Sequence, residues 1–153
     1  MKMIKLITPR RLMKFLSFWP PYFFSGIKVI SVNDSFTKID VCMKHRFWNT
    51  NYVGSHFGGS LYSMCDPFYM FILLHHLKGH IIWDKGASFV FKKPGYGPMY
   101  VTFEISSNTI DQLRCEAEKS FSISPIFKTR VRDQNDDTII ELEKVLYIKK
   151  KSK

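Results

Sequence analysis

The chain has 153 residues, of which 45% are hydrophobic and 16% aromatic, and its formal net charge is +10 at pH 7. This length is enough for one full hydrophobic core and too short for two. The three cysteines form no C-x-x-C pattern, which excludes the common zinc and redox motifs, and no secretory leader is recognisable. An odd number of cysteines without a leader predicts a reducing, cytoplasmic location.

The excess of positive charge suggests three classes of partner: nucleic acids, membrane surfaces and anionic small molecules. The lysines are dispersed and no helix-turn-helix, zinc-finger or RNA-binding motif is present, so a nucleic-acid partner is not expected. The longest apolar run, from Leu61 to Leu74, is too short to span a bilayer and contains Asp66, so a stable membrane anchor is not expected either.

Residues 1–25 are expected to form a basic, helical lead-in. Apolar residues between Leu12 and Phe18 alternate with Arg10, Arg11 and Lys14, which predicts a short amphipathic helix. The favoured interpretation is that this helix packs on its own domain. The alternative is that it lies on a membrane surface.

Two strands are predicted next, at 26–31 and 36–43, and the turn residues at 32–35 join them as a hairpin. After a polar loop, a central helix is expected over 58–77. It has no polar face, so it should be buried. Pro67 removes a backbone hydrogen bond within it, so the helix should kink or break there.

The remaining segments predict two strands at 87–93 and 99–106, joined by the turn PGYGP, and then a helix at 108–119 capped by Asn108. A long final hairpin is expected at 122–132 and 138–150. Antiparallel hairpins around one apolar helix indicate an α+β fold, in which a curved antiparallel sheet is wrapped around a long central helix. Residues 1–153 are therefore expected to form a single domain.

One stretch, NYVGSHFGGSLYSMCD, resembles the pattern N-x-x-G-[ST]-x-H-G-G, then six residues of any kind and a D, which is found in hotdog-fold acyl-CoA thioesterases. The resemblance is to the phenylacetyl-CoA thioesterase-like branch, and within it to a subgroup of unknown function that has FGG in place of HGG. The match has no gap. The matching residues are Asn51, Gly54, Ser55, Gly58, Gly59 and Asp66, with Phe57 at the histidine position.

The resemblance implies a hotdog fold and a homodimer, which in some relatives associates into a tetramer, with each site between two protomers. It also implies an acyl-CoA-type substrate, in which coenzyme A is part of the substrate, and no separate cofactor. Backbone N–H groups near Phe57, Gly58 and Gly59 would stabilise the oxyanion of a thioester under attack. Asp66 of the partner would act as the general base, with a pKa raised by partial burial, or alternatively as the nucleophile, and Asn51 would position water or the carbonyl.

The same resemblance places the substrate-binding residues. Ser55 and His56 lie in the motif loop, and His56 is one position away from the motif histidine, so it is not expected to replace it. Asp84 falls near the position where relatives have a serine or threonine on the following strand. By their charge, Lys92 and Lys93, with the tail lysines Lys149 to Lys151, could meet the phosphates of coenzyme A, although a solvated basic face explains them as well.

Several observations leave alternatives open. Without the motif histidine, a site with Phe57 could lose about 3 kcal/mol of transition-state stabilisation. The second hypothesis is therefore a protein of the same fold that binds acyl-CoA or a lipid-like ligand without turnover. Asp66 before Pro67 also fits a helix N-cap followed by proline at the first helical position. Gly58 and Gly59 could serve only close packing, and no histidine spacing indicates a metal site.

Overall fold

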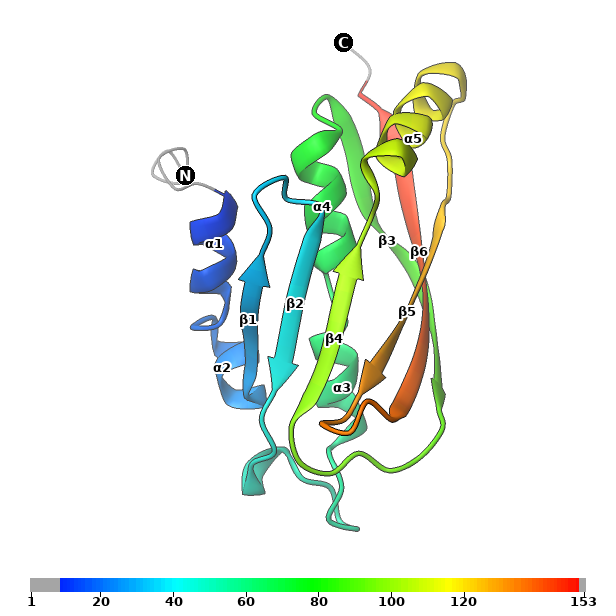
Figure 1. Ribbon diagram of the computed structural model, residues 1–153. Helices are drawn as coiled ribbons and strands as arrows, with labels where there is room; N and C mark the ends of the chain where they lie inside the picture. Colours follow the sequence, from blue (N-terminus) through cyan, green and yellow to red (C-terminus); the bar gives the residue numbers. More distant parts are fainter. Residues whose placement is uncertain (1–8, 152–153) are drawn as a thin grey trace.

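The computed structural model describes residues 9–151, without the side chains of residues 9 and 10, so residues 1–8 of the predicted lead-in lie outside it (Figure 1). The helices are α1 (Pro9–Leu16), α2 (Pro20–Ser25), the short 3-10 helix η2 (Phe47–Asn49), α3 (Gly58–Met64), α4 (Phe68–His76) and α5 (Ser107–Lys119). The strands are β1 (Ile27–Val32), β2 (Lys38–Met43), β3 (His80–Phe91), β4 (Met99–Glu104), β5 (Ile126–Arg132) and β6 (Thr138–Lys150).

The six strands form one antiparallel sheet in the order β1-β2-β4-β5-β6-β3. The sheet curves around α3 and α4, while α1 and α2 lie beside β1 at one edge (Figure 1). This confirms the predicted α+β class and the curved sheet around a central helical segment. The two edges of the sheet, β1 and β3, are left without a further strand.

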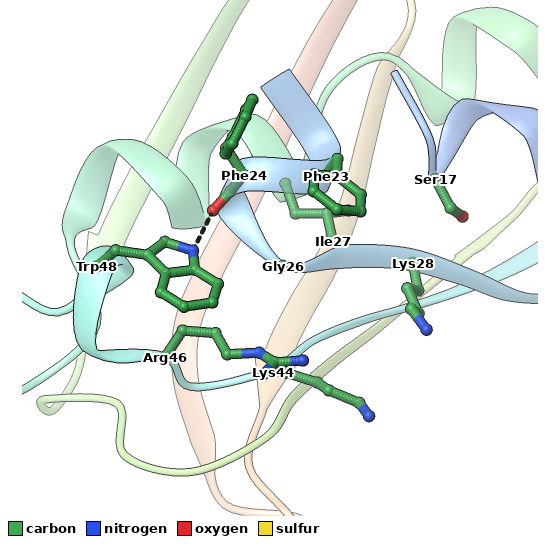
Figure 2. Close-up of a pocket in the computed structure, with 9 residues that line it drawn as sticks. All are labelled: Ser17, Phe23, Phe24, Gly26, Ile27, Lys28, Lys44, Arg46 and Trp48. Atoms are coloured by element: carbon green, nitrogen blue, oxygen red, sulfur yellow. Dashed lines mark hydrogen bonds between the residues drawn. The ribbon is translucent and has the colours of Figure 1, made fainter. Parts of the chain in front are cut away.

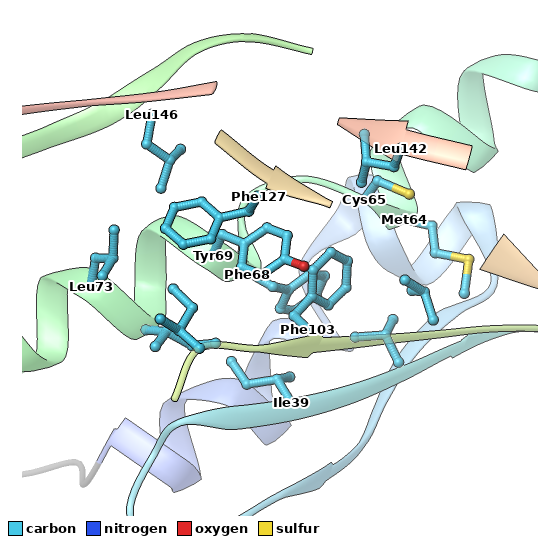
Figure 3. Close-up of a cluster of buried hydrophobic side chains, with 14 of the residues drawn as sticks. Ile39, Met64, Cys65, Phe68, Tyr69, Leu73, Phe103, Phe127, Leu142 and Leu146 are labelled. Atoms are coloured by element: carbon cyan, nitrogen blue, oxygen red, sulfur yellow. The ribbon is translucent and has the colours of Figure 1, made fainter. Parts of the chain in front are cut away.

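Strand β4 shows why the sheet has one buried face. Met99, Val101 and Phe103 are buried, whereas Glu104 on the opposite face is exposed, as strict alternation requires. The ring of Phe103 stacks on Phe68 of α4, with centroids 5.0 Å apart (Figure 3). Aromatic stacking of this kind adds to the free energy gained from burying the two rings. The apolar helix α4 therefore lies in the concave face of the sheet.

The strand pairing corrects part of the prediction. The hairpins 26–43 and 122–150 form, but the strands on either side of PGYGP do not pair: β3 pairs with β6, and β4 pairs with β2 and β5. Strand β3 also begins at His80, seven residues before the predicted start, because its first half continues the ladder along the end of β6. The turn therefore carries the chain from an edge of the sheet to its middle.

The predicted break at Pro67 is confirmed. Helix α3 ends at Met64 and α4 begins at Phe68, with a cis peptide between Asp66 and Pro67. The central segment 58–77 is thus two short helices in place of one long helix. The buried Tyr22 hydroxyl of α2 donates a hydrogen bond to the Asp66 carbonyl at this break.

Two smaller predictions have opposite outcomes. Met13 of α1 and Tyr22 of α2 are buried, so the N-terminal helices do pack on their own domain. The prediction that Asn108 caps α5 is wrong, because Asn108 already lies inside the helix. Ser106 is the N-cap residue, and its hydroxyl accepts a hydrogen bond from the Thr109 amide at 3.1 Å.

Candidate functional site

The break between α3 and α4 brings Asp66 to two side chains of the sheet. Lys144 of β6 donates a hydrogen bond from Nζ to Asp66 Oδ1 at 2.8 Å, and the same Nζ lies 3.4 Å from Asp84 Oδ2 of β3. The Lys144 side chain is only 8% exposed, whereas the Asp84 side chain is 22% and the Asp66 side chain 56% exposed. One buried ammonium group therefore holds two carboxyl groups, and only Asp66 faces outward.

The three groups perturb each other's protonation. Burial raises the pKa of Asp66, but interactions with Asp84 and the hydrogen bond and charge of Lys144 outweigh it, so its net pKa is below the ordinary value. Burial, followed by the neighbouring Asp66 carboxylate, raises the pKa of Asp84 to about 6. The geometry agrees, because Lys144 is closer to Asp66 and Asp84 is more buried. The expectation that burial raises the pKa of Asp66 is therefore wrong.

The carboxylate of Asp66 does not cap α4. Pro67 occupies the N-cap position of that helix and no side chain caps it. The Asp66 side chain is directed to Lys144 instead. The capping interpretation of the Asp-Pro pair is wrong, and the carboxylate is held by a cation of the sheet. The adjacent Cys65 thiol is buried and its pKa is raised to about 12, so it is a core thiol with no nucleophilic character.

The first turn of α3 presents fewer amide donors than expected. The Phe57 amide already donates to the Asn49 carbonyl at 2.8 Å. Gly58 and Gly59 begin the helix, where amides have no intrahelical acceptor, and no other acceptor is found for them among the described residues. Because α3 has only seven residues, its dipole is also smaller than that of the long helix that was expected.

The ring of Phe57 lies over Gly59. A Cβ at Gly59 would be 2.3 Å from Phe57 Cε1, whereas a Cβ at Gly58 would meet only Phe91 Cζ at an ordinary 3.6 Å. A side chain at Gly59 would therefore displace the Phe57 ring, which is exposed enough to move. More than half of Phe57 remains exposed, so its ring lies at the surface beside Gly59.

The motif loop uses its polar residues to hold itself together. Asn51 Nδ2 donates to Ser55 Oγ and to the His56 carbonyl, and Asn51 Oδ1 accepts from the amides of Val53 and Ser55. All four hydrogen-bonding positions of the Asn51 amide are thus directed into the loop. Asn51 and Ser55 are structural residues of this loop, and neither side chain is directed toward Asp66.

His56 joins the motif loop to the turn between β3 and β4. It is buried, its Nε2 lies 2.7 Å from the Gly97 carbonyl, and its ring is 4.4 Å from the ring of His45. Burial lowers the pKa of His56, and the nearby His45 lowers it further. The hydrogen bond to the Gly97 carbonyl acts in the opposite direction but does not outweigh burial. The histidine is therefore neutral at pH 7 and pins two loops together.

Lys92 and Lys93 lie away from the carboxylate cluster. Lys92 pairs with Glu141 at 2.8 Å and Lys93 with Asp137 at 2.5 Å. Lys92 follows Asp84 by eight residues, which is about 26 Å along an extended strand. Within one protomer these lysines are not brought to Asp66, and each already has a carboxylate partner.

Two residues that contact Asp66, Lys144 and Tyr22, were not predicted from the sequence. In β6, Ile140, Leu142, Leu146 and Ile148 are buried at alternate positions, and Lys144 occupies the same inward phase. A lone lysine in that phase is the signal that could have identified it. The contact of Tyr22 with the Asp66 carbonyl left no such signal, because it joins residues 44 positions apart. Among the described residues, no group of three His, Cys, Asp or Glu side chains could hold a metal ion.

Several solved structures with this architecture are named as thioesterases or as thioesterase candidates. A protein of unknown function from Pseudomonas aeruginosa, named as a thioesterase candidate, has a TM-score of 0.79 at 16% identity, covering 94% of each chain. A thioesterase from Haemophilus influenzae gives 0.66 at 11% identity, covering 95% of this chain and 93% of that one. A hypothetical thioesterase from Streptococcus pneumoniae, solved with coenzyme A, gives 0.62 at 13% identity, covering 91% and 99%. At these identities the likeness shows the fold, and this fold is the hotdog fold of thioesterases.

The sequence itself falls within one family. Residues 8–148 match the family described as "Domain of unknown function (DUF4442)", and the chain belongs to it. A comparison with curated proteins gives no match. None of the helices in the described part of the chain is long and apolar enough to cross a membrane.

Proposed function

We propose that this protein is a thioester hydrolase acting on acyl-CoA-type substrates, with Asp66 as the general base. The observation that carries the proposal is the carboxylate cluster: Asp66 is ionised, outward-facing and fixed by Lys144 at the break of the central helix. A fixed carboxylate at this position can take a proton from water that attacks a thioester carbonyl. The fold shared with thioesterases, one of them solved with coenzyme A, supports the substrate class.

Asp84 gives the cluster a second carboxyl group with a different pKa. Because its pKa is about 6, Asp84 exchanges a proton near neutral pH while Asp66 stays ionised. Two carboxyl groups whose environments move their pKa values apart can divide the roles of base and acid. Asp84 is the candidate to return a proton to the leaving thiolate, and Lys144 positions both groups.

We further propose that two copies of the chain build each site. Within one protomer, Asp66 follows the C-terminal end of α3 and the free amides of Gly58 and Gly59 open its N-terminal end, so the helix separates them by about 10 Å. A thioester carbonyl cannot contact both groups at that distance. The edge strand β3 is 12 residues long and carries exposed apolar side chains, which favours pairing with a second copy. Such pairing can bring the amides of one protomer to the carboxylate of its partner.

A second candidate function is supported by two observations. The Phe57 ring covers Gly59, and Lys144 already occupies one oxygen of Asp66. Both features reduce the access of a substrate carbonyl and water to the catalytic groups. The alternative is a hotdog protein that binds acyl-CoA, or a lipid-like ligand, without hydrolysing it.

Thiol release from a panel of acyl-CoAs distinguishes the two functions. The variant Asp66→Asn keeps the shape of the side chain and removes its basicity, so we expect hydrolysis to fall at least a hundredfold. The matched control is Asp111→Asn, which changes an exposed aspartate of α5. Hydrolysis that persists in Asp66→Asn contradicts the catalytic assignment. Binding of acyl-CoA in a calorimeter with no thiol release from wild type supports the second function.

Mixed dimers test whether the site is shared. Gly58→Val places a side chain at the amides, and the space around Gly58 tolerates a Cβ. If each site takes its amides from one protomer and Asp66 from the other, mixing inactive Asp66→Asn with inactive Gly58→Val restores about a quarter of the wild-type sites by random assortment. Failure of the mixture to recover activity, with subunit exchange verified, contradicts a shared site.

A further inference from the structure

The N-terminal helices and η2 expose an unusual number of large aromatic side chains. Within the described residues, Phe18 is 71%, Phe24 66% and Phe47 87% exposed. The other aromatic side chains of this surface that are more than half exposed are Phe15, Trp19, Phe23 and Trp48. Exposed aromatics of this density mark an interaction surface, because leaving them in water is unfavourable. We call these seven side chains the aromatic face.

A basic cavity lies beside the aromatic face. Its volume is about 510 Å³, and its lining includes Phe23, Phe24 and Trp48 together with the cations Lys28, Lys44 and Arg46. Figure 2 shows Trp48 beside Arg46, whose guanidinium carbon lies 5.4 Å from the centre of the Trp48 ring. The Trp48 indole donates a hydrogen bond to the Phe24 carbonyl at 2.7 Å, so η2 and α2 form one surface. Among the described residues, no carboxylate forms an ion pair with these three cations. Elsewhere on the molecule most exposed lysines of the sheet have carboxylate partners, as Lys38 and Lys128 do.

An apolar groove lies on the other side of the α1–α2 turn, and Phe15 and Trp19 of the aromatic face line it. It has a volume of about 400 Å³ and is lined by Leu12, Phe15, Leu16, Trp19, Pro67 and Phe71. All six lining residues are largely apolar, so the groove suits a hydrocarbon chain and has no charged group to bind the phosphate of a nucleotide. The surface therefore combines unpaired cations at one end with an apolar groove at the other.

We infer that this surface binds reversibly to membranes that contain anionic phospholipids. Phosphate headgroups would meet Lys28, Lys44 and Arg46, while Phe and Trp side chains enter the boundary between headgroups and acyl chains. The exposed Arg11 and Lys14 of α1 add to the attraction. Binding of this kind needs no membrane-spanning helix. It also holds the protein at a bilayer independently of any reaction at Asp66.

Two other occupants fit the observations less well. A second copy of the chain would bring three unpaired cations against the same three, in a chain whose net charge is already +10, so self-association here is repulsive. A nucleic acid would satisfy the cations but not the apolar groove. The aromatic face lies on the β1 side of the sheet, so pairing through the opposite edge, β3, leaves it free.

Vesicle co-sedimentation of the full chain tests the inference. Wild type should bind vesicles of phosphatidylcholine mixed with phosphatidylglycerol and detach as salt rises, with far weaker binding to pure phosphatidylcholine. Lys28→Glu with Lys44→Glu should lower the partition coefficient at least about thirtyfold, since each cation near an anionic surface contributes about fivefold. The matched control is Lys78→Glu with Lys119→Glu, which makes the same charge change at the opposite end of the molecule. An equal loss in the control overturns the inference.

A second pair of variants tests the apolar contribution. Phe23→Ser with Phe24→Ser should weaken binding at least about tenfold, whereas Phe121→Ser, which also changes an exposed ring, should not. Circular dichroism establishes that each variant is folded. No vesicle binding by wild type, or binding that is unaffected by the Phe23 and Phe24 changes, overturns the inference. Tighter binding of wild type to RNA than to anionic vesicles, lost in the lysine variant, also overturns it.

Tryptophan quenching locates the contact on the molecule. The chain has three tryptophans: Trp19 and Trp48 belong to the aromatic face, and Trp83 lies on β3, stacked on Tyr147. Brominated phospholipids in the vesicles should quench the fluorescence of Trp83→Phe strongly. They should leave Trp19→Phe with Trp48→Phe almost unquenched. The reverse pattern places the membrane on the β3 side and overturns the inference.

Discussion

At the scale of single residues, one buried lysine decides the chemistry of the candidate site. Lys144 separates the pKa values of two aspartates that are otherwise alike, because it is closer to Asp66 and because Asp84 is more buried. Removing the ammonium group would leave two neighbouring carboxylates without a counter-charge. The cluster therefore acts as a unit, and each member is best tested through the behaviour of the others.

The first prediction concerns Asp84 and pH. Its folded pKa of about 6 is above the ordinary 3.8, so the folded state keeps a proton that the unfolded state has lost between these values. Stability from this group is present at low pH and is lost as pH rises to about 6. The unfolding free energy of Asp84→Asn minus that of wild type should therefore increase by about 1–2 kcal/mol as pH rises from 4 to 7. Urea unfolding at several pH values measures this. Parallel curves for the two proteins would show that Asp84 titrates normally.

The second prediction concerns the two glycines of α3. Gly59→Ala should destabilise the protein by about 1 kcal/mol or less, because the new Cβ displaces the Phe57 ring and this half-exposed ring can turn away. Gly58→Ala is the matched control and should be neutral or slightly stabilising, since its Cβ makes an ordinary contact and alanine favours the helix. In Phe57→Ala, the Gly59→Ala change should lose its penalty. Denaturant unfolding of the four proteins gives this double-mutant cycle, and a penalty that persists would place the clash elsewhere.

At the scale of elements, the motif loop is held by its own polar residues. Asn51 saturates its amide within the loop, and His56 fastens the loop to Gly97. These contacts set the position of Phe57 and the first turn of α3. The loop therefore contributes to the candidate site by placing a helix end, and its polar side chains are already in use.

The third prediction follows from the buried His56. Its folded pKa is below the unfolded value of about 6.5, so at lower pH the unfolded state binds a proton that the folded state refuses. Stability should therefore fall as pH drops below 6.5. In His56→Gln this fall should be about 1 kcal/mol smaller between pH 6.5 and pH 5. Thermal or urea unfolding over this range measures the difference, and an identical fall in both proteins would mean that other groups cause it.

At the scale of the whole molecule, the two sheet edges have different characters. The β1 edge is covered by α1 and α2 and presents the aromatic face with its cations. The β3 edge is long, open and apolar, and the aromatic rings of Tyr62 and Phe89 lie 4.0 Å apart beside it. One molecule can thus pair with a copy through β3 while the opposite edge meets a membrane.

The fourth prediction tests the β3 edge. Ala87→Lys with Phe91→Lys places charges on two exposed positions of this strand, and edge lysines oppose strand pairing. Sedimentation velocity should show a dimer for wild type and a monomer for the variant, with thioester hydrolysis lost in parallel. Phe18→Lys, an exposed ring between α1 and α2 on the β1 side of the sheet, should remain dimeric. A wild-type monomer with full activity would exclude a site shared between chains.

Much of the fold could be predicted from the sequence because its cause is local. Alternation in β4 and β6, the turn residues between β1 and β2, and Pro67 in an apolar helix each act over a few neighbouring residues. The motif likewise proposes Asp66, Gly58 and Gly59 as site residues by their spacing, and their roles stay a prediction. Such patterns reflect the geometry of strands and helices, which does not depend on what packs against them.

Only the tertiary structure determined which side chains contact the residues of the candidate site. The pairing of β3 with β6 brings Asp84 beside Lys144, and the broken central helix brings Asp66 to the same ammonium group, so the direction of two pKa shifts depends on segments far apart in the chain. The positions of the Phe57 ring and of Tyr22 were set in the same way. Charge and burial act through space, whereas sequence patterns describe only neighbours along the chain. The sequence alone therefore determined the elements and the hotdog class, and the packing of those elements determined the chemistry of the site.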